Sequence, residues 1–346
     1  MLPNPPTPPP IPGPPTMSGD RPFWSVMIPV YRPRLDLLTE TLRCVLAQAP
    51  APDEMEIVVV DDASGDSRIE RTIAEIGGGR IAYHQEPVNR GLAATWNRCI
   101  ERAGGRWIHI LHQDDLVMPG FYAALRRGCE SSNAGAAYCR HAWIDSNGHW
   151  IALSALESAL PGILPDFARA LAVAVKIQTP SVVVRRDVYE EVGGFLPTLC
   201  YTLDWEMWQR IAWRFPFWYE PQILACYRLH PGSESARLAT ADRQRSDVLR
   251  CIELCTNHAP PAEAASLARL ARRSHALGLL SQVMDPVLTG NFAAARALIL
   301  GAVKTSMHRS VLGRAFSQGI WATREQLRCL AKGPRHPVPA PDAANR

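Results

Sequence analysis

Two pairs of adjacent carboxylates, Asp61-Asp62 and Asp114-Asp115, are the residues of this chain best suited to chemistry. The pairs follow the apolar runs 56–60 and 107–111. Apolar runs of this length that end in a turn are typical of buried strands. Neighbouring carboxylates repel each other unless donors or a cation neutralise them, and Mg²⁺ or Mn²⁺ shared with a phosphate suits such oxygen ligands. Taken alone, the second pair would be explained better as caps of the following turn or helix.

The elements around these pairs predict how they are positioned. Residues 25–31 form a third strand-like run, and 34–48 carry the apolar spacing of a helix. Residues 63–66 are typical of a turn that leads into a helix, with Asp66 as its capping residue. The order strand, helix, strand, helix predicts a parallel sheet with right-handed crossovers. Three strand ends should therefore meet at one edge, where open α/β sheets bind ligands.

Four segments in this order resemble a known family. They are SVMIPVYRP, IVVVDDASGD, NRGLAATWNRCIERAGGRWIHILHQDD and LDWEMWQRIA, and the similarity extends from about Phe23 to Ser235. Together they are similar to the signatures of family 2 glycosyltransferases. The resemblance implies an α/β protein with the GT-A fold, a Rossmann-like, mostly parallel sheet flanked by helices. It also implies transfer of a sugar from a nucleotide-diphosphate donor to an acceptor hydroxyl, with inversion at the anomeric carbon.

The resemblance also implies a donor site. The matching residues are Pro29, Tyr31, Asp61, Asp62, Asn89, Arg90, Gly91, His112, Gln113 and Asp114. Gly91 permits a close approach of backbone to ligand, and the guanidinium fork of Arg90 matches phosphate oxygens. For Asn89 an ordinary helix N-cap is as good an interpretation as a donor contact.

A metal site for Mn²⁺ or Mg²⁺ follows from the same resemblance, with Asp114, Asp115 and His230 as its ligands. Asp114 matches the last acid of the family's Asp-x-Asp motif, but His112 stands where the first acid is usual. Three interpretations stay open: His112 binds the metal as a neutral imidazole, it contacts the donor, or the metal is held more weakly. A metal here would offset the charge of the departing diphosphate.

Asp204, at the head of a predicted amphipathic helix, matches the family's catalytic base. An inverting displacement needs one carboxylate to take the proton of the acceptor hydroxyl, and a neighbouring tryptophan would raise the pKa of that carboxylate. The acid that usually precedes the base is replaced by Leu203, which leaves Glu206 as a weaker rival. The alternative is that Asp204 only caps the helix and Glu206 faces solvent.

Composition narrows the class of protein. The 346 residues carry a formal charge of +4 with no nucleic-acid-binding motif, so no nucleic acid partner is expected. Nine cysteines without metal-type spacing and no secretory signal favour the cytoplasm, and Cys251 and Cys255 should be buried on one helix face. No apolar run reaches the roughly 20 residues of a membrane span, and no Gln-x-x-Arg-Trp motif follows Asp204. A non-processive enzyme is therefore predicted, with weak contact at the inner face of the cell membrane allowed by its positive charge.

The chain divides into four predicted regions. Residues 1–20 are a Pro-rich, extended and disordered arm, and 21–238 are the transferase domain, with a nucleotide-sugar half (21–120) and an acceptor half (121–238). Residues 239–332 are a helical appendage that could cover the acceptor side, form a homodimer or meet a membrane, and 333–346 are a disordered tail.

Two other functions compete with this prediction. A sugar nucleotidyltransferase usually has a Gly-rich basic loop after the first strand, where this chain has PVYRPRLD. A non-catalytic scaffold on a decayed transferase fold is favoured only by His112. Among relatives UDP is the expected nucleotide, with GDP and dTDP open, and a glycan or lipid-linked acceptor in cell-surface polysaccharide or glycolipid assembly is expected by analogy.

Overall fold

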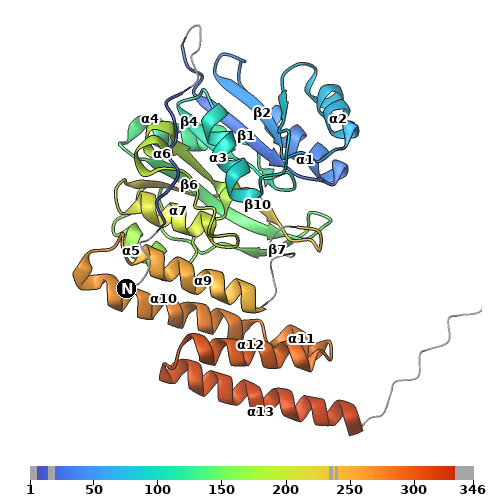
Figure 1. Ribbon diagram of the computed structural model, residues 1–346, viewed down its shortest axis with the longest axis vertical. Helices are drawn as coiled ribbons and strands as arrows, with labels where there is room; N and C mark the ends of the chain where they lie inside the picture. Colours follow the sequence, from blue (N-terminus) through green and yellow to red (C-terminus); the bar gives the residue numbers. More distant parts are fainter. Residues whose placement is uncertain (1–5, 15–19, 234–236, 238–240, 332–346) are drawn as a thin grey trace, which may run out of the picture. The chain divides into compact units, whose positions relative to one another are not determined.

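The computed structural model describes residues 6–14, 20–233, 237 and 241–331. The chain forms two compact units, Met1–Ala268 and Arg269–Arg346, which are described separately (Figure 1). The predicted tail 333–346 and residues 1–5 and 15–19 of the predicted arm lie outside the described residues.

The first half of the sheet is parallel, as the alternation of strands and helices predicts. Its strands are β1 (Trp24–Val30), β2 (Met55–Asp61), β3 (Ala82–Gln85) and β4 (Trp107–Ile110), in the spatial order β3-β2-β1-β4. The connecting helices are α1 (Leu35–Leu46), α2 (Ser67–Gly77) and α3 (Leu92–Arg102). Trp24 is in register with both Met55 and Trp107, so the carboxyl ends of β1, β2 and β4 share one edge. The predicted convergence of strand ends is confirmed.

The second half of the chain makes the sheet mixed. The spatial order continues from β4 through β9 (Val182–Arg185), β6 (Ala136–Ile144), β10 (Phe217–Arg228) and β5 (Leu116–Val117), with β7 (Trp150–Leu153) on β6 and β8 (Gly162–Ile163) on β10. β9 is antiparallel to both β4 and β6, whereas β6 and β10 are parallel. The 3-10 turn η1 (Thr179–Ser181) precedes β9, because Pro180 has no N–H for a strand ladder.

Helices cover this sheet and complete the first unit. They are α4 (Phe121–Ser131), α5 (Phe167–Val173), α6 (Arg186–Val192), α7 (Leu203–Ala212), α9 (Ala241–Cys255) and the start of α10 (Pro261–Ser281). The main core contains Val26, Ile28, Val59, Leu111 and Phe121, none of them more than 3% exposed. Gly128 of α4 lies directly against the Trp218 ring, where a Cβ would be 2.1 Å from a ring carbon.

The Pro-rich arm is ordered where it is described, which corrects the prediction of a disordered arm for residues 6–14. Ile11 is 6% exposed. The carbonyl of Pro9 accepts a hydrogen bond from the Gly194 N–H (2.8 Å), and that of Pro12 accepts one from Arg186 Nη2 (3.1 Å). The arm is extended, as its composition predicts. It is ordered because the first unit donates hydrogen bonds to its carbonyls and buries the Ile11 side chain.

The second unit is helical, and holds the end of α10, α11 (Met284–Leu288), α12 (Phe292–Thr305) and α13 (Arg309–Ala331). Its own core contains Leu280, Val283, Ala302 and Val311, all fully buried. Among the described helices, none is long and apolar enough to cross a membrane.

Candidate active site

The end of β1 is joined to the turn after β4 by a side chain. Gln113 Oε1 accepts a hydrogen bond from the Tyr31 N–H (2.9 Å), and Gln113 Nε2 donates to the Tyr31 carbonyl (3.4 Å). Pro29 is buried in β1, in register with Val60 of β2. The predicted donor residues Pro29, Tyr31 and Gln113 are therefore brought together at the carboxyl edge of the sheet.

The Asp61 and Asp62 side chains are buried and satisfied within the protein. Asp61 Oδ2 accepts from the Tyr83 hydroxyl (2.7 Å), and Asp61 Oδ1 accepts from the Ser64 N–H (3.0 Å). Burial and the Asp61 charge raise the pKa of the Tyr83 hydroxyl, which therefore remains a donor. Asp62 accepts from the N–H groups of Arg90 (2.8 Å) and Gly91 (2.9 Å). These carboxylates shape the edge of the site through the bonds they make inside the chain.

The segment 89–91 is held over this edge. Gly91 is the N-cap of α3, with a φ of 83° that favours glycine, so Asn89 is not the cap. Asn89 Nδ2 instead donates to the Asp62 carbonyl (3.2 Å). The Arg90 side chain is exposed, and among the described residues no acceptor lies within hydrogen-bond distance of its guanidinium. Arg90 is thus left free for an anionic ligand.

The turn after β4 separates the two acids of the second pair. Asp114 Oδ2 lies 2.7 Å from His230 Nε2. Asp115 is 1% exposed, and its Oδ2 and Oδ1 are taken by His112 Nδ1 (3.0 Å) and the Arg228 N–H (2.8 Å). Because Asp115 is enclosed and both of its oxygens accept hydrogen bonds inside the protein, Asp114 and His230 are the more accessible of the three predicted metal ligands. The role of Asp115 is to hold His112 and the end of β10.

Arg228 is a buried cation that fastens this turn. Its Nε donates to the Asp114 carbonyl (2.8 Å), and its Nη2 pairs with Glu40 Oε2 (2.6 Å). Thr41 Oγ1 donates to the Asp115 carbonyl (2.8 Å). The shape of the turn is therefore fixed by side chains of α1 and β10.

His112 has one ring nitrogen engaged and one without a partner. Its ring stacks on Trp96 with centroids 4.9 Å apart, and its Nε2 is buried with no hydrogen bond. Burial opposes the charged form, but the bond to Asp115 and the charges of Asp115, Asp114 and Asp204 raise the pKa of His112 above its ordinary value. The unpartnered Nε2 is the atom of this residue that a ligand could use.

The predicted base lies in the first turn of α7, with Thr202 as the N-cap. Asp204 Oδ1 accepts from the Trp205 N–H (2.7 Å), and Oδ2 accepts from Thr179 Oγ1 of η1 (3.4 Å). Desolvation by burial raises the pKa of Asp204 to about 6, a value suited to a base near neutral pH. The charge of Asp204 raises the pKa of His112, and that of His112 opposes the rise at Asp204, so the two side chains lie close enough to interact electrostatically.

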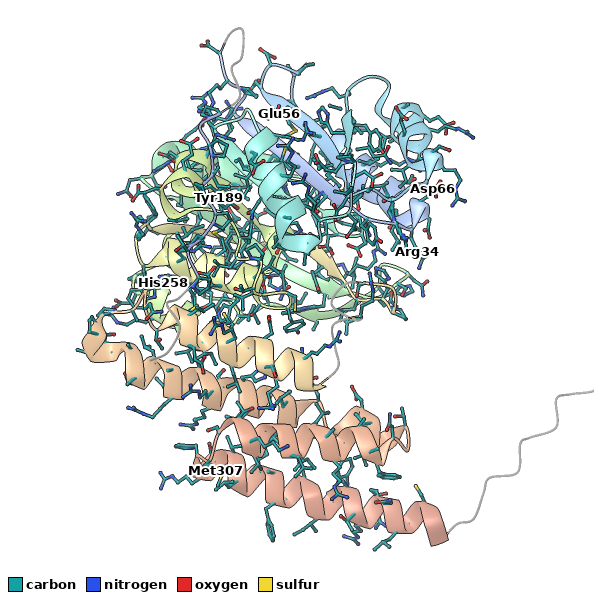
Figure 2. The ribbon with its side chains drawn as sticks, viewed as in Figure 1. Arg34, Glu56, Asp66, Tyr189, His258 and Met307 are labelled. Carbon is teal, nitrogen blue, oxygen red and sulfur yellow. The ribbon has the colours of Figure 1, made fainter. Side chains whose placement is uncertain are left out.

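Glu206 is not available as a rival base, and it does not face solvent. It is 1% exposed and forms a two-bond ion pair with Arg210 (3.0 and 2.8 Å). His258, labelled in Figure 2, lies 3.3 Å from the same carboxylate. These partners hold the pKa of Glu206 below its ordinary value against its own desolvation. Glu206 therefore anchors α7, and its carboxylate is sequestered.

Two side chains near the strand ends, Asp114 and His230, are candidate ligands for a divalent cation. Among the described residues no group of three or more His, Cys, Asp or Glu side chains is arranged to hold a metal. The protein offers the close pair of one carboxylate and one imidazole, Asp114 and His230. One or two protein ligands completed by phosphate oxygens and water is the ordinary arrangement for Mg²⁺ in nucleotide sites. The residues fit a cation that arrives with a diphosphate.

Comparison with known proteins gives the family. The model of the glycosyl transferase family 2 matches residues 25–193, which include the three strand ends and the turn 112–115. Residues 25–193 belong to glycosyltransferase family 2. The match ends before Asp204 and His230, so those two residues are supported by geometry alone.

The transferase has relatives of low identity. It is 26% identical over 241 residues to an uncharacterized protein of Mycobacterium tuberculosis, with 65% of this chain and 74% of that protein covered. It is 25% identical over 227 residues to an uncharacterized glycosyltransferase of Rickettsia felis, with 64% of this chain covered. Because it spans only 37% of that longer protein, the two need not share a whole-chain activity.

Solved structures confirm the GT-A fold. The S. aureus TarS structure of residues 1–349 in complex with UDP-GlcNAc has a TM-score of 0.62 at 15% identity, covering 89% of this chain and 92% of that one. A mannosyltransferase from Pyrobaculum calidifontis, in complex with GDP-Man and Mn²⁺, has a TM-score of 0.55 at 21% identity, covering 89% and 88%.

Three residues that position the site of the transferase were missed by sequence reasoning. Arg228 is one. Asp247 of α9 accepts from the N–H groups of Tyr201 (2.9 Å) and Thr202 (2.8 Å) and so fixes the start of α7. His109, whose pKa burial lowers to about 3, joins β4 to η1 through the Pro180 carbonyl (3.0 Å). A charged residue inside an apolar strand, as in 106–111 and 223–228, was the available signal for His109 and Arg228.

Proposed function

We propose that this transferase moves a sugar from a nucleotide-diphosphate donor to an acceptor hydroxyl with inversion, and that Asp204 is the catalytic base. The observation that carries the proposal is the half-buried Asp204 carboxylate, whose pKa of about 6 lets it accept a proton at neutral pH. Both Asp204 and Asp114, the partner of His230, act electrostatically on His112, which supports a base adjoining a diphosphate site. Attack and departure on opposite sides of the anomeric carbon need this arrangement.

The donor is proposed to lie along the carboxyl edge of β1, β2 and β4. Tyr31, Gln113 and the Asp61–Asp62 edge would receive the nucleoside, and Arg90 and His112 Nε2 would receive phosphate oxygens. Within the described part of the chain, exposed Arg90 is a donor fork without a protein acceptor and the buried His112 Nε2 has no hydrogen bond, which is costly until a ligand satisfies it. UDP is the nucleotide we expect, and the acceptor class we propose is a glycan or a lipid-linked sugar.

Asp114 and His230 would hold Mn²⁺ or Mg²⁺ together with the diphosphate. When bound, the cation supplies charge stabilisation to the leaving group. The protein's own part is to keep Asp114 and His230 within 2.7 Å of each other while Arg228 holds the turn that carries Asp114. The Asp204 carboxylate takes the hydroxyl proton as the new glycosidic bond forms, and the nucleoside diphosphate leaves with the electron pair of the broken bond.

The test is a donor panel of UDP-, GDP- and dTDP-sugars with simple glycoside acceptors and Mn²⁺. Nuclear magnetic resonance of the product gives the anomeric configuration, and inversion is expected. Asp204→Asn should lose at least 100-fold in turnover while keeping donor affinity, because general bases contribute roughly 10²–10⁴.

Asp187→Asn is the matched control, since Asp187 is an exposed acid in the first turn of α6 and should keep full activity. A product that retains its configuration, or equal turnover by Asp204→Asn, contradicts the assignment of the base. Donor binding without any transfer, in wild type and control alike, would favour the scaffold alternative.

A further inference from the structure

The two units of the chain carry opposite charge. Residues 269–331 contain nine Arg and Lys residues against two acids, Asp285 and Glu325, a formal charge of +7. Residues 1–268 contain 25 Arg and Lys residues against 30 acids, a formal charge of −5. The nearly neutral total therefore conceals a strongly basic helical unit, and such asymmetry indicates a partner with an anionic surface.

The last helix of that unit has an unburied apolar stripe. Phe316, Ile320 and Leu327 are 71%, 55% and 61% exposed. At about 100° per residue these positions fall within roughly 40° of one another around α13. The opposite side of the helix packs inward, with Val311 fully buried and Gln318 Nε2 donating to the Leu280 carbonyl (2.8 Å). We call the stripe, with Thr323, Arg324 and Arg328, the α13 outer face.

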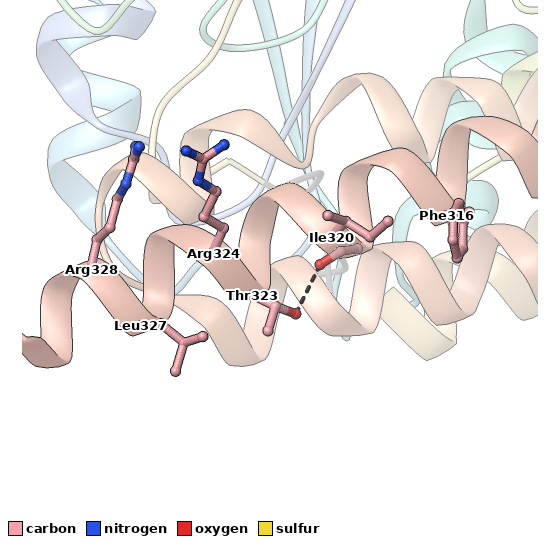
Figure 3. Close-up of a pocket in the computed structure, with 7 residues that line it drawn as sticks. Phe316, Ile320, Thr323, Arg324, Leu327 and Arg328 are labelled. Carbon is pink, nitrogen blue, oxygen red and sulfur yellow. Dashed lines mark hydrogen bonds between the residues drawn. The ribbon is translucent and has the colours of Figure 1, made fainter.

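Cations flank this stripe, as Figure 3 shows for Arg324 and Arg328. Arg324 is exposed, and Arg328 pairs with Glu325 of the same helix (2.6 Å). The Thr323 hydroxyl is turned to its own helix, where it donates to the Gly319 carbonyl (2.9 Å). The α13 outer face thus presents apolar groups and positive charge, and no uncompensated acid.

We propose that the α13 outer face docks on the surface of an anionic lipid bilayer. Exposed aromatic and aliphatic side chains flanked by arginines are what an amphipathic helix inserts among headgroups and acyl chains, and the formal charge of +7 on residues 269–331 attracts anionic lipids. A second copy fits less well, because a symmetric interface would bring two copies of the positively charged segment 269–331 together. A nucleic acid would satisfy the arginines but would leave the apolar stripe in water.

The test is flotation of the full chain with lipid vesicles at low salt. Wild type should float with vesicles of phosphatidylglycerol mixed with phosphatidylcholine, and should stay behind with phosphatidylcholine alone. The variant Phe316→Ser/Ile320→Ser/Leu327→Ser should bind roughly tenfold or more weakly, since its buried apolar area is gone. Arg324→Gln/Arg328→Gln should weaken binding roughly fivefold for each arginine and reduce its salt dependence.

Two matched controls come from the first unit. Leu156→Ser/Leu160→Ser removes exposed leucines (55% and 75%), and Arg43→Gln/Arg71→Gln removes exposed arginines, and both should bind as wild type does. All the changed side chains are exposed, so circular dichroism should be unaltered.

The proposal is overturned if wild type ignores anionic vesicles, or if the triple serine variant floats as well as wild type. A different result would also overturn it: light scattering shows that wild type is a dimer and the triple variant a monomer, and wild type does not bind vesicles. That result would assign the α13 outer face to a second copy of the chain. Donor binding by the transferase site is a separate measurement, so failure of one proposal is distinguishable from failure of the other.

Discussion

Replacing Asp204 by Asn should make the transferase more stable at neutral pH while it loses turnover. The side chain keeps its shape, and its amide oxygen can still accept from the Trp205 N–H. The substitution removes the negative charge of a carboxylate that is poorly solvated in the native state. Residues tuned for chemistry commonly cost stability in this way.

The size of the effect follows from the pKa of Asp204. The native state raises it from an ordinary 3.8 to about 6, which at 1.36 kcal/mol per pH unit corresponds to about 3 kcal/mol. Because the native state binds this proton more tightly than the unfolded state, wild type carries no penalty below pH 4. As pH rises from 4 through 6 the penalty develops, and above pH 7 it is complete. Asn cannot ionise, so the variant avoids it.

The assay is thermal unfolding of both proteins from pH 4 to pH 8. The melting temperature of the variant, relative to that of wild type, should rise by several degrees between pH 4 and pH 8, since each kcal/mol of stability corresponds to roughly 2–4 °C in a domain of this size. Asp187→Asn, whose side chain is 63% exposed, should show no such pH-dependent gain. A difference between Asp204→Asn and wild type that does not change between pH 5 and pH 7 would refute a desolvated carboxylate at this position.

Three further predictions concern the rest of the site and the core. Arg228→Leu should lower the free energy of unfolding by roughly 1–3 kcal/mol in denaturant titration, because the Asp114 carbonyl loses its guanidinium donor and the pair with Glu40 is removed; an unchanged midpoint would contradict the fastening role. Asp114→Asn should abolish the Mn²⁺-dependent part of nucleotide-sugar binding in calorimetry, and equal metal dependence in wild type and variant would remove Asp114 from the ligand set. Gly128→Ala should lower the free energy of unfolding by roughly 1–3 kcal/mol or more, since the added methyl group would overlap the Trp218 ring. Gly313→Ala, at an open position of α13, should leave this free energy unchanged or raise it.

The sequence was most informative where periodicity and position coincide. Alternating strands and helices predicted the parallel order of β1, β2 and β4 and the shared edge of their carboxyl ends, and both are confirmed. The cap at Asp66 and the buried pair Cys251–Cys255 are confirmed as well, since each depends on local spacing. Local patterns are read reliably because neighbouring residues determine them.

The sequence was least informative about which oxygen atom of each acid meets which donor. Asp114 and Asp115 are adjacent residues of the same type, yet Asp114 contacts His230 and Asp115 is enclosed by His112 and Arg228. Both His230 and Arg228 lie more than 100 residues away along the chain. The burial of Glu206 was hidden in the same way, because its partner His258 lies in a distant segment and a pair with Arg210, four residues on, also occurs on exposed helix faces. The disorder predicted for residues 6–14 failed for a similar reason, because composition does not reveal the hydrogen-bond donors that Arg186 of α6 and Gly194 provide.

Arg228 also makes the conformation of the turn 114–115 independent of a bound metal. A permanent guanidinium between Glu40 and the turn 114–115 keeps that turn folded by protein contacts alone. The geometry does not have to be rebuilt whenever a cation comes or goes, unlike domains whose folding depends on their metal. A divalent ion could therefore bind together with each donor and leave with each product, while the turn 114–115 keeps its conformation between turnovers.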